Sequence, residues 1–131
     1  MKSPLYYSAN AILLLDDEFD IMTVFTLGLE EQGFHVVGFT EPLLALDHFQ
    51  INSEQYGLVI SDLRMPVMNG YQFIKKVKEI KPQVKVFFIS AFDIDDIEFR
   101  TELPFVKVDE FIQKPISLKD LTGTVSKHIN I

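Results

Sequence analysis

The chain has 131 residues, of which 47% are hydrophobic and 24% charged, so it has the size and composition of one domain that buries a core. Its net charge of −7 argues against direct binding of nucleic acid, because affinity for a phosphate backbone depends on a positive field. The absence of cysteine excludes disulfides and thiolate metal sites, and no apolar stretch reaches the roughly 18 residues that span a bilayer, so we expect a cytoplasmic protein without membrane contact.

Five short apolar runs recur along the chain at a regular spacing. We interpret residues 1–9 as a polar N-terminal lead, and the first run follows it. The runs are Ala11–Leu15, Phe34–Phe39, Gly57–Ser61, Val84–Ser90 and Asp109–Ile112. Runs that are apolar throughout are typical of strands buried on both faces, and the spacing leaves room for one helix after each strand. The runs therefore predict five β-α units.

The first intervening segment predicts an amphipathic helix. Ile21, Val24 and Phe25 recur at helical spacing, and Leu29 continues the same apolar face. Gly33 follows as a C-terminal cap, because glycine adopts the left-handed conformation that ends many helices. We therefore expect these four apolar side chains to face the core.

The later segments carry helix signals of unequal strength. A second helix is predicted with Thr40 and Pro42 at its start and Asn52 and Ser53 closing it, and a third from about Tyr71 to Ile80. Ser117 and Asp120 have capping-box spacing and predict the start of the last helix. The fourth segment, Asp93–Leu103, is acidic and only loosely amphipathic, so we expect a short or mobile helix there.

Alternating strands and helices of this kind predict a doubly wound α/β domain. Parallel strands need helical crossovers, and the crossovers cover both faces of the sheet. Ligands in such sheets bind beyond the carboxyl ends of the strands, where the strand order reverses. The polar residues at the strand ends are therefore the candidate functional residues.

Three carboxylates, a hydroxyl and an ammonium group occupy those strand ends. Asp16 and Asp17 follow the first strand, Asp62 the third, Ser90 closes the fourth and Lys114 follows the fifth. Carboxylates that share one edge repel each other unless a cation lies among them. Oxygen ligands without cysteine suit a hard divalent ion such as Mg²⁺, which often completes its shell with phosphate oxygens. The pattern therefore indicates metal-assisted phosphoryl chemistry.

Four strings of sequence together resemble the receiver domain of two-component response regulators: LLLDDE, SDLRMPVMNG, FFISA and FIQKP, in that order. The resemblance spans nearly the whole chain. It implies a single receiver domain over residues 1–131, with a flavodoxin-like (βα)5 fold and a five-stranded parallel sheet in the order 2-1-3-4-5. It also implies a signalling domain that is no enzyme beyond catalysing its own phosphorylation and dephosphorylation.

The resemblance assigns roles to the residues at the strand ends. It implies that Asp62 takes a phosphoryl group from the phosphohistidine of a sensor histidine kinase or phosphotransfer protein. Asp17, Asp62 and the backbone carbonyl of Arg64 would bind Mg²⁺ or Mn²⁺, with Asp16 acting through water. Lys114 would pair with a phosphoryl oxygen, and its peptide bond to the following proline would be cis.

Further residues are implied to transmit the change. Ser90 would turn toward the phosphoryl group and Phe111 would change rotamer, altering the surface near the fourth helix and fifth strand for a downstream protein. Arg64 and Phe92 would flank the site entrance and, being bulky, would slow hydrolysis of the phosphorylated form; alternatively, Arg64 would contact the phosphoryl group. We expect Gly70 to relieve backbone strain in the loop after the phosphoacceptor, and the protein to be a monomer or a phosphorylation-dependent dimer.

Two other functions remain open at this point. A degenerate receiver-like interaction module would keep the fold without taking phosphate. A Mg²⁺-dependent phosphohydrolase that forms an aspartyl phosphate would usually carry a second aspartate two residues after the nucleophile, where this chain has Arg64. Asp16 and Asp17 could also simply cap a helix, which is common for an isolated acidic pair.

Overall fold

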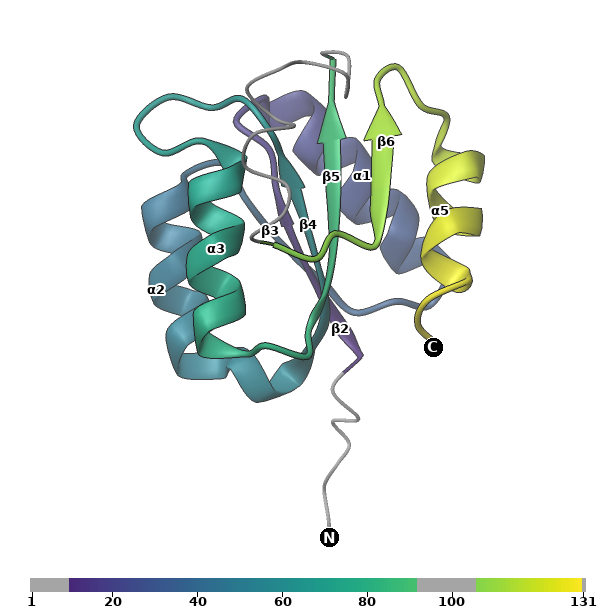
Figure 1. Ribbon diagram of the computed structural model, residues 1–131. Helices are drawn as coiled ribbons and strands as arrows, with labels where there is room; N and C mark the ends of the chain where they lie inside the picture. The colour runs from purple at the N-terminus through teal and green to yellow at the C-terminus, as the bar shows by residue number, and fades with distance from the viewer. Residues whose placement is uncertain (1–9, 92–105, 131) are drawn as a thin grey trace, which may run out of the picture.

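The computed structural model describes residues 10–91 and 106–130; strands alternate with helices in the first range, and the second holds one strand and one helix (Figure 1). The elements are β2 (Ala11–Leu15), α1 (Phe19–Glu31), β3 (Val36–Phe39), α2 (Pro42–Asn52), the 3-10 turn η1 (Ser53–Gln55), β4 (Tyr56–Asp62), α3 (Gly70–Ile80), β5 (Lys85–Ser90), β6 (Glu110–Gln113) and α5 (Leu118–Ser126). The predicted fourth helix, residues 93–103, lies outside the described residues. No helix in the described part of the chain is long and apolar enough to cross a membrane.

The five strands form one sheet in the order β3-β2-β4-β5-β6, and every neighbouring pair is parallel. Counted along the chain, this is the order 2-1-3-4-5, so the predicted fold is confirmed. The order reverses at β2, whose two neighbours are β3 and β4. All carboxyl ends meet at the upper edge of the sheet in Figure 1, where ligands of such sheets bind.

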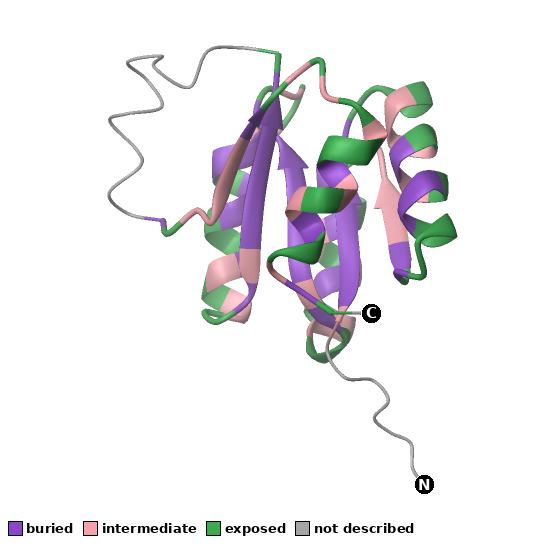
Figure 2. Ribbon diagram, turned by 90° about the vertical axis from the view of Figure 1, so that its right-hand side faces the viewer, coloured by how far each residue is buried: buried purple, intermediate pink, exposed green. Residues whose placement is uncertain are grey.

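The side chains of successive strand residues pack into two separate cores, one on each face of the sheet. In β2, Leu13 and Leu15 pack with residues of α2 and α3, whereas Ile12 and Leu14 pack with residues of α1 and α5. Figure 1 shows these two helix pairs on opposite sides of the sheet, and Figure 2 shows the strands largely buried between them. Burial on both faces explains why β2 is apolar at every position, whereas the edge strands β3 and β6 are only partly buried and β6 carries Glu110 and Gln113.

The end of α1 confirms the predicted glycine cap. Gly33 has a φ of 101°, and its N–H donates to the carbonyl of Glu30 at 2.9 Å. The N–H of Phe34 donates to the carbonyl of Leu29 at 3.2 Å, which completes a Schellman motif. The expectation that Val24 faces the core is wrong, because its side chain is 56% exposed.

Side-chain caps begin two of the helices. At α3, the side chain of Asn69 accepts a hydrogen bond from the N–H of Gln72 at 2.8 Å, and the Gln72 side chain accepts from the N–H of Asn69 at 3.1 Å. This reciprocal capping box was not predicted. At α5, the hydroxyl of Ser117 accepts from the N–H of Asp120 at 3.0 Å, at the position where the sequence predicted the helix to start.

The loop between β4 and α3 corrects the role expected for Gly70. The left-handed residue is Val67, with a φ of 71°, and not Gly70. Gly70 is needed for space: a Cβ added to it would lie 2.1 Å from the carbonyl oxygen of Asp62 and 2.8 Å from the Cα of Leu63. Its N–H donates to the Leu63 carbonyl at 2.7 Å, so the backbone at the end of β4 is held directly against the start of α3.

We predict opposite effects for two glycine-to-alanine substitutions, measured by chemical denaturation. Gly70→Ala should destabilise the protein by about 1–3 kcal/mol, because backbone atoms must move to admit the methyl group. Gly123→Ala should stabilise it by about 0.5–1 kcal/mol, because Gly123 lies inside α5 with open space at its Cβ position. A Gly70→Ala protein as stable as the wild type would contradict the close approach.

Candidate functional site

Three carboxylates converge at the carboxyl edge of the sheet. Asp16 and Asp17 follow β2, and Asp62 is the last residue of the neighbouring strand β4. One carboxylate oxygen from each residue lies within 4.8 Å of the others. Asp16 is fully buried and Asp62 is 6% exposed, whereas Asp17 is exposed. The pairing of Leu15 with Ser61 sets this arrangement, because it brings the ends of the two strands level.

Lys114 brings an ammonium group to these carboxylates from the segment after β6. Its Nζ lies 2.8 Å from Oδ2 of Asp16, 3.3 Å from Oδ2 of Asp62 and 3.4 Å from Oε1 of Glu18. The backbone N–H of Lys114 donates to the carbonyl of Ser90 at 2.7 Å, which holds this segment to the end of β5. The contact with Glu18 was not predicted from the sequence.

The electrostatics of the site reflect burial and crowding. Burial raises the pKa of the Asp62 carboxyl to about 6; Asp16 and Asp17 add to the rise, and Lys114 opposes it. Burial also acts to lower the pKa of Lys114, but its hydrogen bond with Asp16 and the charge of Asp62 outweigh burial, so the net pKa of Lys114 is raised. The single ammonium thus offsets only part of the negative charge.

The donor set fits a divalent cation. Both oxygens of Asp16 already have partners, because Oδ1 accepts a hydrogen bond from the N–H of Glu18 at 2.9 Å and Oδ2 accepts from Lys114. Asp17 is exposed and Asp62 keeps its charge only at a cost, so both carboxylates favour an additional cation. Carboxylate oxygens are the ligands that Mg²⁺ and Mn²⁺ prefer.

The other predicted residues occupy different parts of the site. Ser90 is buried at the end of β5, and Arg64 is exposed two residues after the aspartate of β4. Phe111 lies on β6, partly buried, with its ring centroid 6.1 Å from that of Phe88 on β5. Phe92 lies outside the described residues. The structure therefore brings Ser90 and Phe111 onto adjacent strands and leaves Arg64 at the rim.

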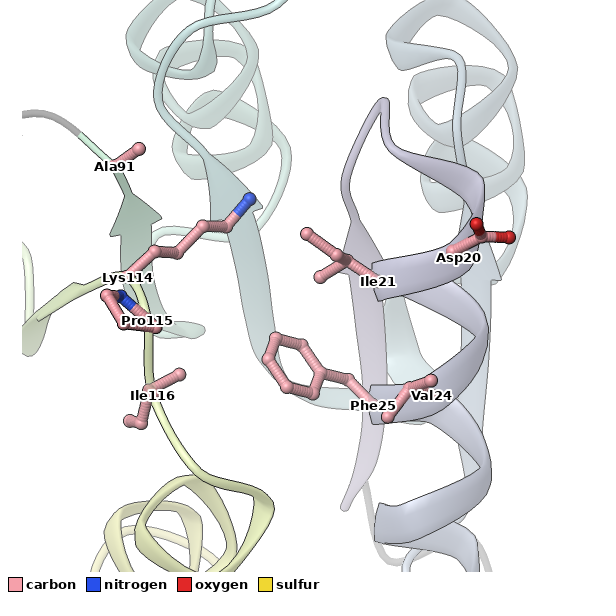
Figure 3. A pocket seen from close by; sticks show the side chains of 8 residues that line it. All are labelled: Asp20, Ile21, Val24, Phe25, Ala91, Lys114, Pro115 and Ile116. Carbon is pink, nitrogen blue, oxygen red and sulfur yellow. The ribbon is translucent and has the colours of Figure 1, made fainter.

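A groove of about 530 Å³ lies beside Lys114, between α1 and the segment after β6 (Figure 3). It is lined by Asp20, Ile21, Val24, Phe25, Ala91, Lys114, Pro115 and Ile116. Most of these side chains are apolar, and the Lys114–Pro115 peptide bond at its wall is cis, as the resemblance implied. Val24 was expected in the core but faces this groove. An open apolar surface here was not predicted.

Comparison with known proteins identifies the family. The model of the response regulator receiver domain matches residues 12–126. The response regulator receiver protein CpdR of Brucella abortus is 29% identical over 116 residues, which cover 88% of this chain and 93% of CpdR. Sensor kinase CckA of the same organism is 28% identical over 116 residues, but this chain spans only 12% of that kinase.

A solved structure agrees with the sequence relatives. The response regulator receiver domain protein from Clostridium thermocellum is 26% identical, with a TM-score of 0.79 over 92% of this chain and 94% of that chain. The family match, the strand order and the acidic cluster at the reversal point of the sheet all agree. This chain belongs to the response regulator receiver domain family, the phosphoacceptor domains of two-component signalling.

Proposed function

We propose that Asp62 is the phosphoacceptor and that it takes a phosphoryl group from a phosphohistidine on a partner protein. The observation that carries the proposal is the position of its carboxylate. It is buried at the end of β4, 3.3 Å from the Lys114 ammonium, with one oxygen each from Asp16 and Asp17 within 4.8 Å. A positioned carboxylate beside a fixed cation suits nucleophilic attack on phosphorus.

Phosphoryl transfer to Asp62 exchanges one bond to phosphorus for another. A carboxylate oxygen of Asp62 forms a bond to phosphorus as the bond from phosphorus to the donor imidazole nitrogen breaks, and the electron pair leaves with that nitrogen. Asp62 must be ionised to attack, and Lys114 favours this by opposing the burial that raises the pKa of Asp62. Lys114 would then pair with a phosphoryl oxygen, since its Nζ already lies beside the attacking group.

Asp17, Asp62 and the backbone carbonyl of Arg64 would hold Mg²⁺ or Mn²⁺. Asp16 would act through water, which is supported by the partners that both of its oxygens already have. The bound ion would offset the negative charge that gathers on the phosphoryl oxygens. Asp17 is exposed beside the two buried aspartates, which leaves the cluster open toward solvent on its side.

Phosphorylation of Asp62 would change the protein surface through the two strands β5 and β6. The Ser90 hydroxyl would donate to the phosphoryl group and pull the end of β5 inward. The Ser90 carbonyl accepts from the N–H of Lys114, so this movement would pass to the segment after β6. Phe111 is paired with Phe88 across these strands and would change rotamer. The altered surface would lie near β6, the fifth strand in chain order, and the predicted fourth helix, which is outside the described residues. A downstream protein would bind this surface and so receive the signal.

The donor would be a sensor histidine kinase or a phosphotransfer protein. Similarity to part of sensor kinase CckA supports a kinase pathway. The groove beside Lys114 supports a protein donor, because its apolar side chains, such as Val24 and Ile116, would be covered by a partner whose phosphohistidine reaches Asp62.

Incubation with acetyl phosphate and Mg²⁺ should add one phosphoryl group to the protein, measured by intact mass spectrometry. The adduct should be absent from an Asp62→Asn variant and from samples without divalent ion, because the nucleophile or its charge compensation is then missing. If the wild type forms no adduct and binds no beryllofluoride, the chain is a degenerate interaction module and the proposal is wrong.

The Asp62→Asn variant should also be more stable than the wild type in EDTA at pH 7–8, by about 1 kcal/mol. The folded pKa of Asp62, about 6, lies above its unfolded value of 3.8, so the folded protein loses stability as pH rises from 4 to 6. The difference between the two proteins should therefore vanish below about pH 4, as measured by denaturation at several pH values. Equal stability at pH 8 would contradict the crowding of charge.

Arg64 and Phe92 would slow hydrolysis of the phosphorylated form by restricting water at the site entrance. Replacing both with alanine should raise the dephosphorylation rate several-fold, which corresponds to about 1 kcal/mol of activation free energy. Loss of phosphate from purified phosphoprotein, followed by intact mass, measures this rate. A dephosphorylation rate that stays the same or falls would show that these two side chains do not slow hydrolysis.

A further inference from the structure

Glu18 places a fourth carboxylate at the phosphoacceptor site. Its Oε1 lies 3.4 Å from Nζ of Lys114, although its side chain is 61% exposed. The residue is held at this position by its backbone N–H, which donates to Oδ1 of Asp16 at 2.9 Å. Glu18 does not belong to the cluster of Asp16, Asp17 and Asp62 that could hold a metal ion.

The Lys114 ammonium is therefore shared among three carboxylates of different character. Asp16 at 2.8 Å and Asp62 at 3.3 Å are both buried and reach Lys114 inside the site. The carboxylate of Glu18 is largely in water on the outer side. A phosphoryl group on Asp62 brings oxygens that also pair with this ammonium. The ion pair between Lys114 and one of its present carboxylate partners must then weaken. The exposed Glu18 is the partner that water can replace at least cost.

We infer that Glu18 is a positioning residue that acts through Lys114 and limits how tightly the site holds a phosphoryl group. In the resting site it holds the ammonium from the outer side and competes with the phosphoryl oxygens for it. This inference rests on the proposed role of Asp62, since the competition exists only if that residue carries the phosphoryl group.

Calorimetric titration with beryllofluoride at saturating Mg²⁺ tests the inference, because this anion mimics the phosphoryl group on an aspartate. Glu18→Gln removes the charge and keeps the shape of the side chain. It should tighten beryllofluoride binding by about 1.5- to 5-fold, the range that exposed ion pairs allow. Glu31→Gln is the matched control: it makes the same change on an exposed residue at the opposite end of α1 and should leave the affinity unchanged.

A double-mutant cycle distinguishes action through Lys114 from a general effect of charge. In a Lys114→Met background, Glu18→Gln should no longer alter the affinity, because the shared ammonium is absent. NMR of the metal-free protein gives a reading that does not depend on beryllofluoride: Glu18→Gln should shift the Lys114 side-chain resonances and Glu31→Gln should not.

The outcomes separate the inference from the proposed function. If the wild type binds beryllofluoride but Glu18→Gln binds no more tightly than Glu31→Gln, the inference is wrong while the phosphoacceptor role stands. Persistence of the Glu18→Gln effect without Lys114, or unchanged Lys114 resonances, would also overturn it. If neither the wild type nor any variant binds beryllofluoride, the phosphoacceptor role fails and the inference fails with it.

Discussion

The ion pair between Lys114 and the two buried carboxylates of Asp16 and Asp62 is the interaction on which the site depends. Burying two like charges side by side is costly: burial and the neighbouring aspartates raise the pKa of Asp62 to about 6, although Lys114 opposes this rise. One ammonium cannot neutralise two buried carboxylates and the exposed Asp17 beside them. The excess negative charge favours a further cation, which in the proposed function would offset the charge of an anionic phosphoryl group.

The topology of the sheet makes this concentration of charge possible. Because β2 lies between β3 and β4, the aspartates that follow β2 meet the aspartate that ends β4, although the two segments are far apart in the chain. Lys114 arrives from the other side, beyond β6, and its backbone is tied to the end of β5. Gly70 lets the start of α3 approach the Asp62 carbonyl, so the end of β4 packs directly against α3.

Much of this could be predicted from the sequence because burial leaves a strong signal. The central strands are buried on both faces and mainly apolar, and the edge strands keep short apolar runs, so the five strands of the described residues were predicted near their observed places. The polar residues that end parallel strands must then lie at one edge of the sheet. The strand order came from the resemblance to a family, since no local pattern encodes which strands are neighbours. The cap at Gly33 was predictable because it depends on residues close in sequence.

Other features depend on packing between distant segments and left no local signal. Val24 follows the apolar spacing of α1 but faces a groove, because the segment after β6 does not cover it. Gly70 was expected to adopt an unusual backbone conformation, whereas it is required by its closeness to Asp62. No role was predicted for Glu18, because its contact with Lys114 joins residues far apart in the chain.

The most direct test of the central claim is to locate the phosphorylated residue. Borohydride reduces an aspartyl phosphate to homoserine, and peptide mass spectrometry then identifies the modified position. After phosphorylation with Mg²⁺ and acetyl phosphate, we predict homoserine at position 62 and at no other aspartate. Reduction at Asp16, at Asp17 or at another acidic residue instead would contradict the assignment of the nucleophile to Asp62.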